Sequence, residues 1–213
     1  MACPRRRDQS QVFTQMSESV PDKKVELRRS FREKLKLMSA EERTGASAQI
    51  CQRLLEQVMW QTARSVLCYV PTAGEPGIWP LVIEALGQGK QIAILRYVAA
   101  GDEYVPCLIR EADRDLEPGR FGILEPSMSC PKFDLKQLDL ALIPGIGFSL
   151  NGGRLGRGKG YYDRLLAAFS GFKCGVAFDC QLADDFPLEP HDVRLNCILT
   201  PTRCHSVSGQ PRF

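Results

Sequence analysis

Five short apolar runs recur along this chain, and they constrain its fold more than any other feature. They are SVLCYVP, QIAILRYV, DLALIPG, CGVAF and CILTP, which begin at residues 65, 91, 139, 174 and 197. Each is the length of a strand and contains β-branched or aromatic residues, a pattern typical of strands buried on both faces. A further run, EYVPCLIR from residue 103, contains Pro106, which favours an edge or a bulge because proline lacks a ladder donor.

Helical patterns separate several of these runs. KKVELRRSFREKLKLM, residues 23–38, places apolar residues at mostly helical intervals among basic ones. The sequence S-A-E-E at residues 39–42 is a capping box, which predicts a second helix over about residues 40–59. We also expect a helix that runs through Leu86 and another over residues 160–169. Strands that alternate with helices predict an α/β fold, a single-domain open, mostly parallel sheet with helices on both faces and two amino-terminal helices.

Length and charge favour one domain without a dedicated nucleic-acid or membrane surface. A chain of 213 residues, 44% of them hydrophobic, can bury one core of this type. Its formal net charge of +3, from 28 basic and 25 acidic residues, lacks the strong basic excess of nucleic-acid and membrane binders. Its longest apolar stretches fall far short of the roughly 20 residues that span a bilayer.

We therefore divide the chain into a disordered arm over residues 1–22, an α/β domain over residues 23–200 and a frayed tail over residues 201–213. The arm has no apolar segment typical of a secretory signal; a transit peptide is the alternative, although Asp8 and Glu18 are atypical of one. Nine cysteines with no C-x-x-C pair and an odd total indicate buried apolar residues in a reducing compartment rather than zinc ligands. We expect a cytoplasmic monomer.

The most informative segment is PGIGFSLNGGRLGRGKGYYD, residues 144–163, between a predicted buried strand and a predicted helix. In an open α/β sheet such a segment lies at the carboxyl ends of the strands, where ligands bind. Its glycines let the backbone approach a ligand closely, and three cations, Arg154, Arg157 and Lys159, stand within six positions. Backbone amides, a helix N-terminus and arginine forks together suit a polyphosphate.

The same segment fits the first seven positions of a P-loop but not the eighth. Gly160 stands where a serine or threonine would contact magnesium, so the metal ligand must come from elsewhere. Asp163, early in the predicted helix, is the candidate carboxylate. Composition alone leaves two alternatives open, a flexible solvated turn and a segment that contacts RNA.

Four ordered motifs resemble those of the 5-formyltetrahydrofolate cyclo-ligases, also called methenyltetrahydrofolate synthetases. G-x-R-L-G-R-G-K-G-Y-Y-D after P-G-I-G-F is similar to the family signature, and Lys24-x-x-x-Arg28 with S-A-E-E-R at residues 39–43 is similar to its amino-terminal helices. The other two are G-I-L-E-P at residues 122–126 and P-x-E-x-H-D-V at residues 187–193, the latter followed by I-L-T of the terminal strand. The likeness covers about residues 23–200.

This resemblance implies an enzyme of one-carbon metabolism that uses ATP and Mg²⁺ and binds a small-molecule folate. It implies that Lys24 and Arg28 contact nucleotide phosphate, although the residues alone would indicate a solvated helical face. It implies that Asp163 and Asp192 bind Mg²⁺, an ion that prefers oxygen ligands. The implied ATP-binding loop consists of Arg154, Leu155, Gly156, Arg157, Gly158, Lys159, Gly160, Tyr161 and Tyr162.

The resemblance also implies a folate site. Glu75 falls where the family holds its folate by a glutamate, and a carboxylate can accept paired hydrogen bonds from the amino-pyrimidine edge of a pteridine. Tyr162 is the second implied folate contact. P-G-I-W-P after Glu75 departs from the family's usual E-[IV]-x-T, and Leu95 precedes Arg96 where the family usually has proline. Both departures bear on the folate pocket and leave the ATP loop intact.

The family's reaction joins phosphoryl transfer to ring closure. The formyl oxygen of 5-formyltetrahydrofolate attacks the terminal phosphate of ATP and ADP leaves. The nitrogen at position 10 then attacks the activated carbon, and phosphate leaves to give 5,10-methenyltetrahydrofolate. Positioning and charge stabilisation dominate such chemistry, and we expect Arg157 and Lys159 to be the catalytic residues. The alternatives are a paralogue that uses ATP on another amide or formamide, and an RNA-binding protein that uses the basic arm and the Arg157 loop.

Overall fold

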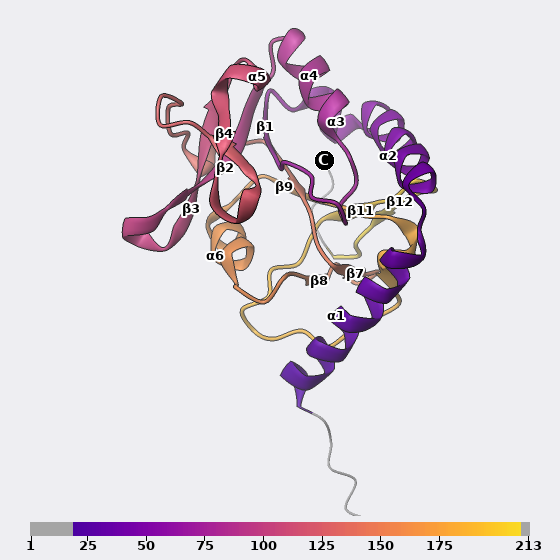
Figure 1. Cartoon of the computed structure of the whole chain (residues 1–213). Coiled ribbons are helices and arrows are strands. Elements are labelled where there is room, and N and C mark those ends of the chain that lie inside the picture. The colour runs from indigo at the N-terminus through magenta and orange to yellow at the C-terminus, as the bar shows by residue number, and fades with distance from the viewer. Residues whose placement is uncertain (1–18, 210–213) are drawn as a thin grey trace, which may run out of the picture.

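The central sheet has seven strands in the order β12-β11-β9-β6-β1-β2-β3 (Figure 1). The structure is a computed structural model that describes residues 19–209. The inner five strands are parallel to one another, whereas β3 and β12 pair antiparallel at the two edges. The parallel strands are β1 (Ser65–Cys68), β2 (Gln91–Val98), β6 (Leu140–Ile143), β9 (Phe172–Val176) and β11 (Cys197–Leu199). The edge strands are β3 (Glu103–Ile109) and β12 (Cys204–Ser206).

Side chains of the inner strands alternate between two apolar cores, one on each face of the sheet. On β1, Val66 and Cys68 enter one core and Leu67 enters the other, as the two-residue period of a strand requires. The first core is covered by α2 (Ala40–Leu55), α3 (Val58–Thr62) and α4 (Trp79–Gly87), and the second by α6 (Tyr161–Ala168), as Figure 1 shows. The apolar runs are therefore continuous because both of their faces are buried.

Helix α1 (Val20–Leu37) packs beside a second, three-stranded sheet of order β10-β7-β8. The strands are β7 (Gly147–Ser149), β8 (Arg154–Leu155) and β10 (Leu182–Ala183). Phe31 of α1 is buried with Ile146, Leu155 and Phe186, and a Cβ added at Gly147 would meet the Phe31 ring at 2.3 Å. A side chain at position 147 would push α1 away, so this glycine sets the distance between α1 and β7.

The remaining described elements are short and connect the strands. They are α5 (Ala112–Asp115), a hairpin of β4 (Leu116–Pro118) and β5 (Leu124–Pro126), and 3₁₀ turns over Ala99–Gly101, Arg120–Gly122, Leu135–Gln137 and Asp179–Gln181. None of the helices described is both long and apolar enough to cross a membrane.

The predicted fold class is confirmed, including the edge position of EYVPCLIR, but three predicted boundaries were wrong. The second helix ends at Leu55 rather than near residue 59, because Gln57 is extended and turns Met59 and Trp60 into the first core. The predicted frayed tail instead contains β12, whose pairing with β11 is extended by the hydrogen bond from the Val207 amide to the Asn196 carbonyl at 2.9 Å. Residues 19–22, assigned to the arm, cap and begin α1, while residues 1–18 lie outside the described residues.

Candidate active site

The segment at residues 144–163 begins with a hairpin that the sequence analysis did not predict. Strands β7 and β8 pair antiparallel, with Phe148 opposite Arg154, and the Gly153 amide donates to the Ser149 hydroxyl at 3.1 Å. Gly152, in the turn, has a φ of +90°, a conformation that favours glycine. The sequence pattern did not indicate this hairpin because its strands are short and the segment is rich in glycine.

After β8 the chain crosses the rim of a cavity and enters α6. Gly158 and Gly160 have φ values of +94° and +67°, and Gly160 is the residue that caps the N-terminus of α6. The cavity, of about 360 Å³, lies at the carboxyl ends of β1 and β6 and is lined by α1, the loop after β1, β2, β5, the loop after β8 and residues 189–192. Every residue assigned to the site from the sequence lines this one cavity.

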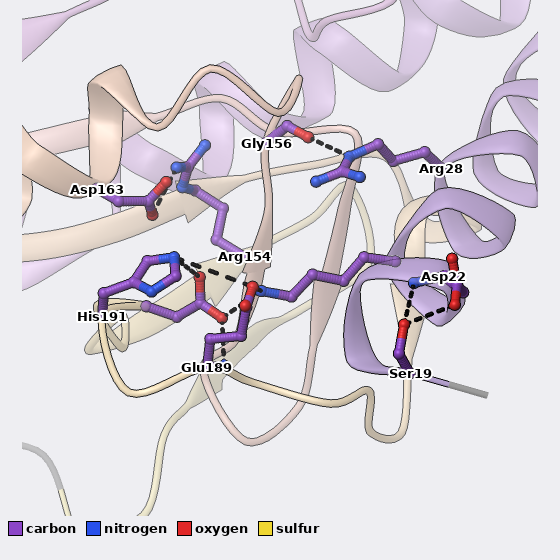
Figure 2. A network of polar contacts seen from close by, with 10 residues as sticks. Ser19, Asp22, Arg28, Arg154, Gly156, Asp163, Glu189 and His191 are labelled. Atoms are coloured by element: carbon purple, nitrogen blue, oxygen red, sulfur yellow. Dashed lines mark hydrogen bonds and ion pairs between the residues drawn. The ribbon is translucent and has the colours of Figure 1, made fainter. Parts of the chain in front are cut away.

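Lys24 and Arg28 bring two cations from α1 to the cavity wall. The Lys24 ammonium donates to the Glu189 and Asp192 carboxylates at 2.7 Å and 2.6 Å, and Lys24 is only 6% exposed. Burial by itself lowers the pKa of Lys24, but the hydrogen bonds from its ammonium to the two carboxylates outweigh burial and raise it. Arg28 Nε donates to the Gly156 carbonyl at 2.9 Å (Figure 2), so these two residues are not part of a solvated face.

Arg154 lies across the cavity floor and pairs with Asp163 of α6, with 2.9 Å between Arg154 Nη2 and Asp163 Oδ1 (Figure 2). The Arg154 side chain is only 4% exposed and its guanidinium lies 5.2 Å from the centre of the Tyr162 ring. Its Nε is buried and has no hydrogen-bond partner among residues 19–209. A buried guanidinium with a vacant donor can bind an additional oxygen, which suits an anionic ligand.

Arg157 bridges the loop after β8 to the loop after β1. Its Nη2 donates to Thr72 Oγ1 at 2.7 Å and to Glu75 Oε1 at 3.1 Å. The other oxygen of Glu75 accepts from the Thr72 amide at 2.9 Å, so both carboxylate oxygens are engaged. Lys159 is exposed at the rim of the cavity. The structure thus joins Arg157 to Glu75 and leaves Lys159 exposed at the cavity rim.

Residues 189–192 place two carboxylates and an imidazole at the cavity wall. Glu189, His191 and Asp192 each offer a ligand atom within 4.8 Å of the others, and His191 Nε2 lies 3.9 Å from both carboxylates (Figure 2). Burial tends to raise the pKa of Asp192, but hydrogen bonds from the Glu189 amide and the Lys24 ammonium bring it below its usual value. Asp192 therefore stays ionised, as a metal ligand requires.

The described structure groups Asp192 with Glu189 rather than with Asp163, whose carboxylate pairs with Arg154. Glu189 was missed as a site residue, although the E-x-H-D spacing at residues 189–192 was the available signal. Two carboxylates in this group are suitable ligands for Mg²⁺, and the Lys24 ammonium between them shows that the position accepts a positive charge.

On β2, Leu95 lines the cavity whereas Arg96 does not. Arg96 is buried and donates to the Ser127 carbonyl at 2.6 Å, so it supports the strand that bears Leu95. Glu125 of β5 is buried at the cavity wall, and its two oxygens accept from the Tyr97 amide at 2.8 Å and the Arg120 amide at 3.2 Å. Glu125 thereby ties the β4–β5 hairpin to β2, a role that the sequence analysis did not assign.

The sequence model of the 5-formyltetrahydrofolate cyclo-ligase family matches residues 20–201. The chain belongs to this family. Among curated cyclo-ligases, the Mycolicibacterium smegmatis enzyme is 35% identical over 147 residues, covering 67% of this chain and 76% of its own length. The Mus musculus enzyme is 26% identical over 189 residues, covering 81% of this chain and 91% of its own.

A solved structure supports the same assignment. The NMR structure of Aquifex aeolicus 5,10-methenyltetrahydrofolate synthetase matches 89% of this chain and 95% of its own with a TM-score of 0.78 and 29% identity. The chain is therefore an enzyme of the cyclo-ligase family, and family membership supports cyclo-ligase activity and implies the use of ATP.

Proposed function

We propose that this cyclo-ligase family enzyme converts 5-formyltetrahydrofolate to 5,10-methenyltetrahydrofolate in a Mg²⁺-dependent reaction that consumes ATP. One observation carries the proposal: the cations of α1, the glycine-rich loop and Glu75 line a single cavity at the carboxyl ends of the strands. A nucleotide and a folate bound there would lie side by side, as transfer of a phosphoryl group from one to the other requires.

The polyphosphate would be bound by the loop that follows β8 and by α1. Backbone amides near Gly158 and Gly160, together with the N-terminus of α6, can hold phosphate oxygens. Lys24, Arg28 and Arg154 add positive charge from the wall and floor. The unpartnered Nε of Arg154 supports an anion at this place.

Glu189 and Asp192 are proposed to hold Mg²⁺, with Asp163 available from α6. The metal, when bound, would offset negative charge on the phosphates. Arg157 and Lys159 are proposed to stabilise charge on the phosphoryl group as the formyl oxygen of the folate attacks it and ADP leaves. The nitrogen at position 10 of the folate then closes the ring on the activated carbon, loses its proton, and phosphate leaves.

Glu75 and Tyr162 are proposed to hold the folate. In the described structure Arg157 Nη2 donates to Glu75 Oε1, so Arg157 and the amino-pyrimidine edge of a pteridine would compete for this carboxylate. Burial raises the pKa of Tyr162, which keeps its phenol protonated at neutral pH and able to donate a hydrogen bond. In this proposal Arg157 gives up its hydrogen bond to Glu75 when the folate binds and contacts the phosphoryl group of the nucleotide instead.

A direct assay tests the proposal. Purified enzyme supplied with 5-formyltetrahydrofolate, ATP and Mg²⁺ should produce the absorbance of the methenyl product, and omission of either ATP or Mg²⁺ should abolish it. Retained ATP binding without turnover would contradict the assigned substrate and favour a different formamide.

A further inference from the structure

The β2–β3 hairpin meets the segment at Arg120 and the start of α6 at the carboxylate of Asp102, which lies at the tip of the hairpin. Asp102 Oδ1 accepts a hydrogen bond from the Tyr97 hydroxyl and another from the Tyr161 hydroxyl, each at 2.8 Å. Arg120 Nη1 lies 3.7 Å from the same oxygen. Tyr161 is the first residue of α6, and it is 59 positions away from Asp102 in the chain.

Aromatic contacts reinforce this junction. The rings of Tyr97, Tyr104 and Tyr161 form a triangle with centroid separations of 5.4, 6.4 and 5.0 Å. The Arg164 guanidinium lies 4.9 Å from the Tyr161 ring centre, and its Nη2 donates to the Asp102 carbonyl at 3.4 Å. Both the side chain and the backbone of Asp102 thus contact the first turn of α6.

The backbone at Asp102 indicates that its side chain matters. Its φ is +44°, and it is the only non-glycine residue with a positive φ among residues 19–209. Glycine would adopt this conformation without the steric cost that an aspartate bears. What aspartate adds is the carboxylate that accepts from the two tyrosines, and a residue held in an unfavourable conformation often marks a functional constraint.

The junction lies directly beside the phosphate loop. Tyr161 follows Gly158, Lys159 and Gly160, whose two glycines occupy left-handed conformations with no side chains to fix them. Arg164 Nη1 donates to the Lys159 carbonyl at 3.4 Å. A contact that immobilises Tyr161 and Arg164 therefore restricts where Lys159 can lie at the cavity rim.

We propose that Asp102 is a positioning residue: it holds Tyr161, and through it the end of the phosphate loop, in the place where Lys159 and the α6 N-terminus meet the nucleotide. The inference rests on the proposed function of that loop. Asp102 at the β2–β3 hairpin tip does not line the cavity, yet the inference assigns it an effect on nucleotide use that is larger than its effect on folate use.

The test compares four variants for kcat, for the KM of each substrate and for thermal stability. Asp102→Gly removes the carboxylate while accepting the left-handed backbone, so we expect an unchanged Tm. We expect the KM for ATP to rise by about fivefold, at the lower end of typical coupling between sites, with the folate KM within about twofold of wild type. Tyr161→Phe should reproduce this pattern because it removes the hydroxyl that links α6 to the hairpin.

Two matched variants act as controls. Tyr97→Phe removes the other hydroxyl donor to Asp102, within the hairpin itself, and should leave the ATP KM near wild type. Asp102→Asn keeps an acceptor oxygen and tolerates a positive φ, so it should recover part of the loss seen in Asp102→Gly. Isothermal titration with a non-hydrolysable ATP analogue alone should show the same order of affinities.

Wild-type nucleotide affinity in Asp102→Gly would overturn the inference, as would an equal rise in the KM of both substrates. Equal damage from Tyr97→Phe and Tyr161→Phe would also overturn it, because the hairpin would then act only through its own folding. Failure of the wild-type enzyme itself to bind the analogue or form product would instead refute the proposed function, so the two failures are distinguishable.

Discussion

Lys159 at the cavity rim is proposed to contribute to turnover and not to the stability of the fold. Lys159 is exposed, so Lys159→Ala should leave the Tm nearly unchanged. We expect its kcat to fall by about 10²–10³-fold, the usual effect of removing one donor that stabilises transition-state charge. The methenyl absorbance assay measures this directly, with Lys136→Ala, an exposed lysine outside the cavity, as control. Wild-type turnover in Lys159→Ala would remove this lysine from the catalytic site.

Thr72 tests the competition between Arg157 and the folate for Glu75. Thr72→Val keeps the shape of the side chain but removes the hydroxyl that accepts from Arg157, so Arg157 should leave Glu75 more easily. We expect a folate KM about twofold lower, consistent with a net value near 1 kcal/mol or less for one exposed hydrogen bond. Thr44→Val serves as control, because the Thr44 hydroxyl donates to the Ala40 carbonyl within α2. A higher folate KM would show that Arg157 supports Glu75 rather than blocks it.

At the scale of elements, the start of β1 depends on one carboxylate from the start of β6. Asp139 Oδ2 accepts from the Arg64 and Ser65 amides at 2.8 Å and 3.0 Å and from the Ser65 hydroxyl at 3.0 Å. Burial tends to raise the pKa of Asp139, but these hydrogen bonds lower it below its usual value. The ionised carboxylate therefore stabilises the pairing of two central strands.

Asp139→Asn should reduce stability in a pH-dependent way. Because the folded-state pKa is depressed, the contribution is complete above the unfolded-state pKa of about 3.9 and disappears as pH falls through the folded-state pKa. We expect a loss of about 1.5–3 kcal/mol at pH 7, the range for hydrogen bonds to a charged group, and a smaller difference toward pH 3. Urea unfolding at both values measures it; a loss that grows as pH falls would contradict the assignment.

Elements that carry an extended pattern were predictable, and those fixed by tertiary contacts were not. The run QIAILRYV matches β2 (Gln91–Val98) to the residue because both of its faces are buried. The β7–β8 hairpin has too few residues to show the two-residue period of a strand. Strand β12 forms through its antiparallel pairing with β11, a tertiary contact that its own sequence does not show. The break at Gln57 likewise depends on where the core receives Trp60.

For the molecule as a whole, the residues that the sequence singled out line one cavity in the structure, but the sequence did not indicate how they pair. Glycines and cations in one segment indicated a phosphate loop, and the alternation of strands and helices placed that segment at the ligand-binding edge of the sheet. Lys24 and Glu189 are 165 residues apart, and the sequence does not show that they pair. Their contact depends on how α1 packs against the three-stranded sheet.

The Lys24 ion pairs should also contribute to global stability. Lys24→Met would leave the Glu189 and Asp192 carboxylates without their shared cation, and removing one partner of a buried pair typically costs about 3–5 kcal/mol. Because Glu189 is 31% exposed, we expect a smaller loss, about 2–3 kcal/mol, in urea unfolding. Lys23→Met, at the exposed neighbouring position, should change stability little. Equal stabilities for the two variants would show that α1 docks through its apolar face alone.

A crystal structure with a non-hydrolysable ATP analogue and Mg²⁺ tests the central claim most directly. We predict that the phosphates of the analogue contact the backbone of residues 156–160 and the side chains of Arg154 and Lys159. The metal should lie at Asp192 and Glu189. Phosphates bound anywhere else, with the loop after β8 making no contact to them, would contradict the account.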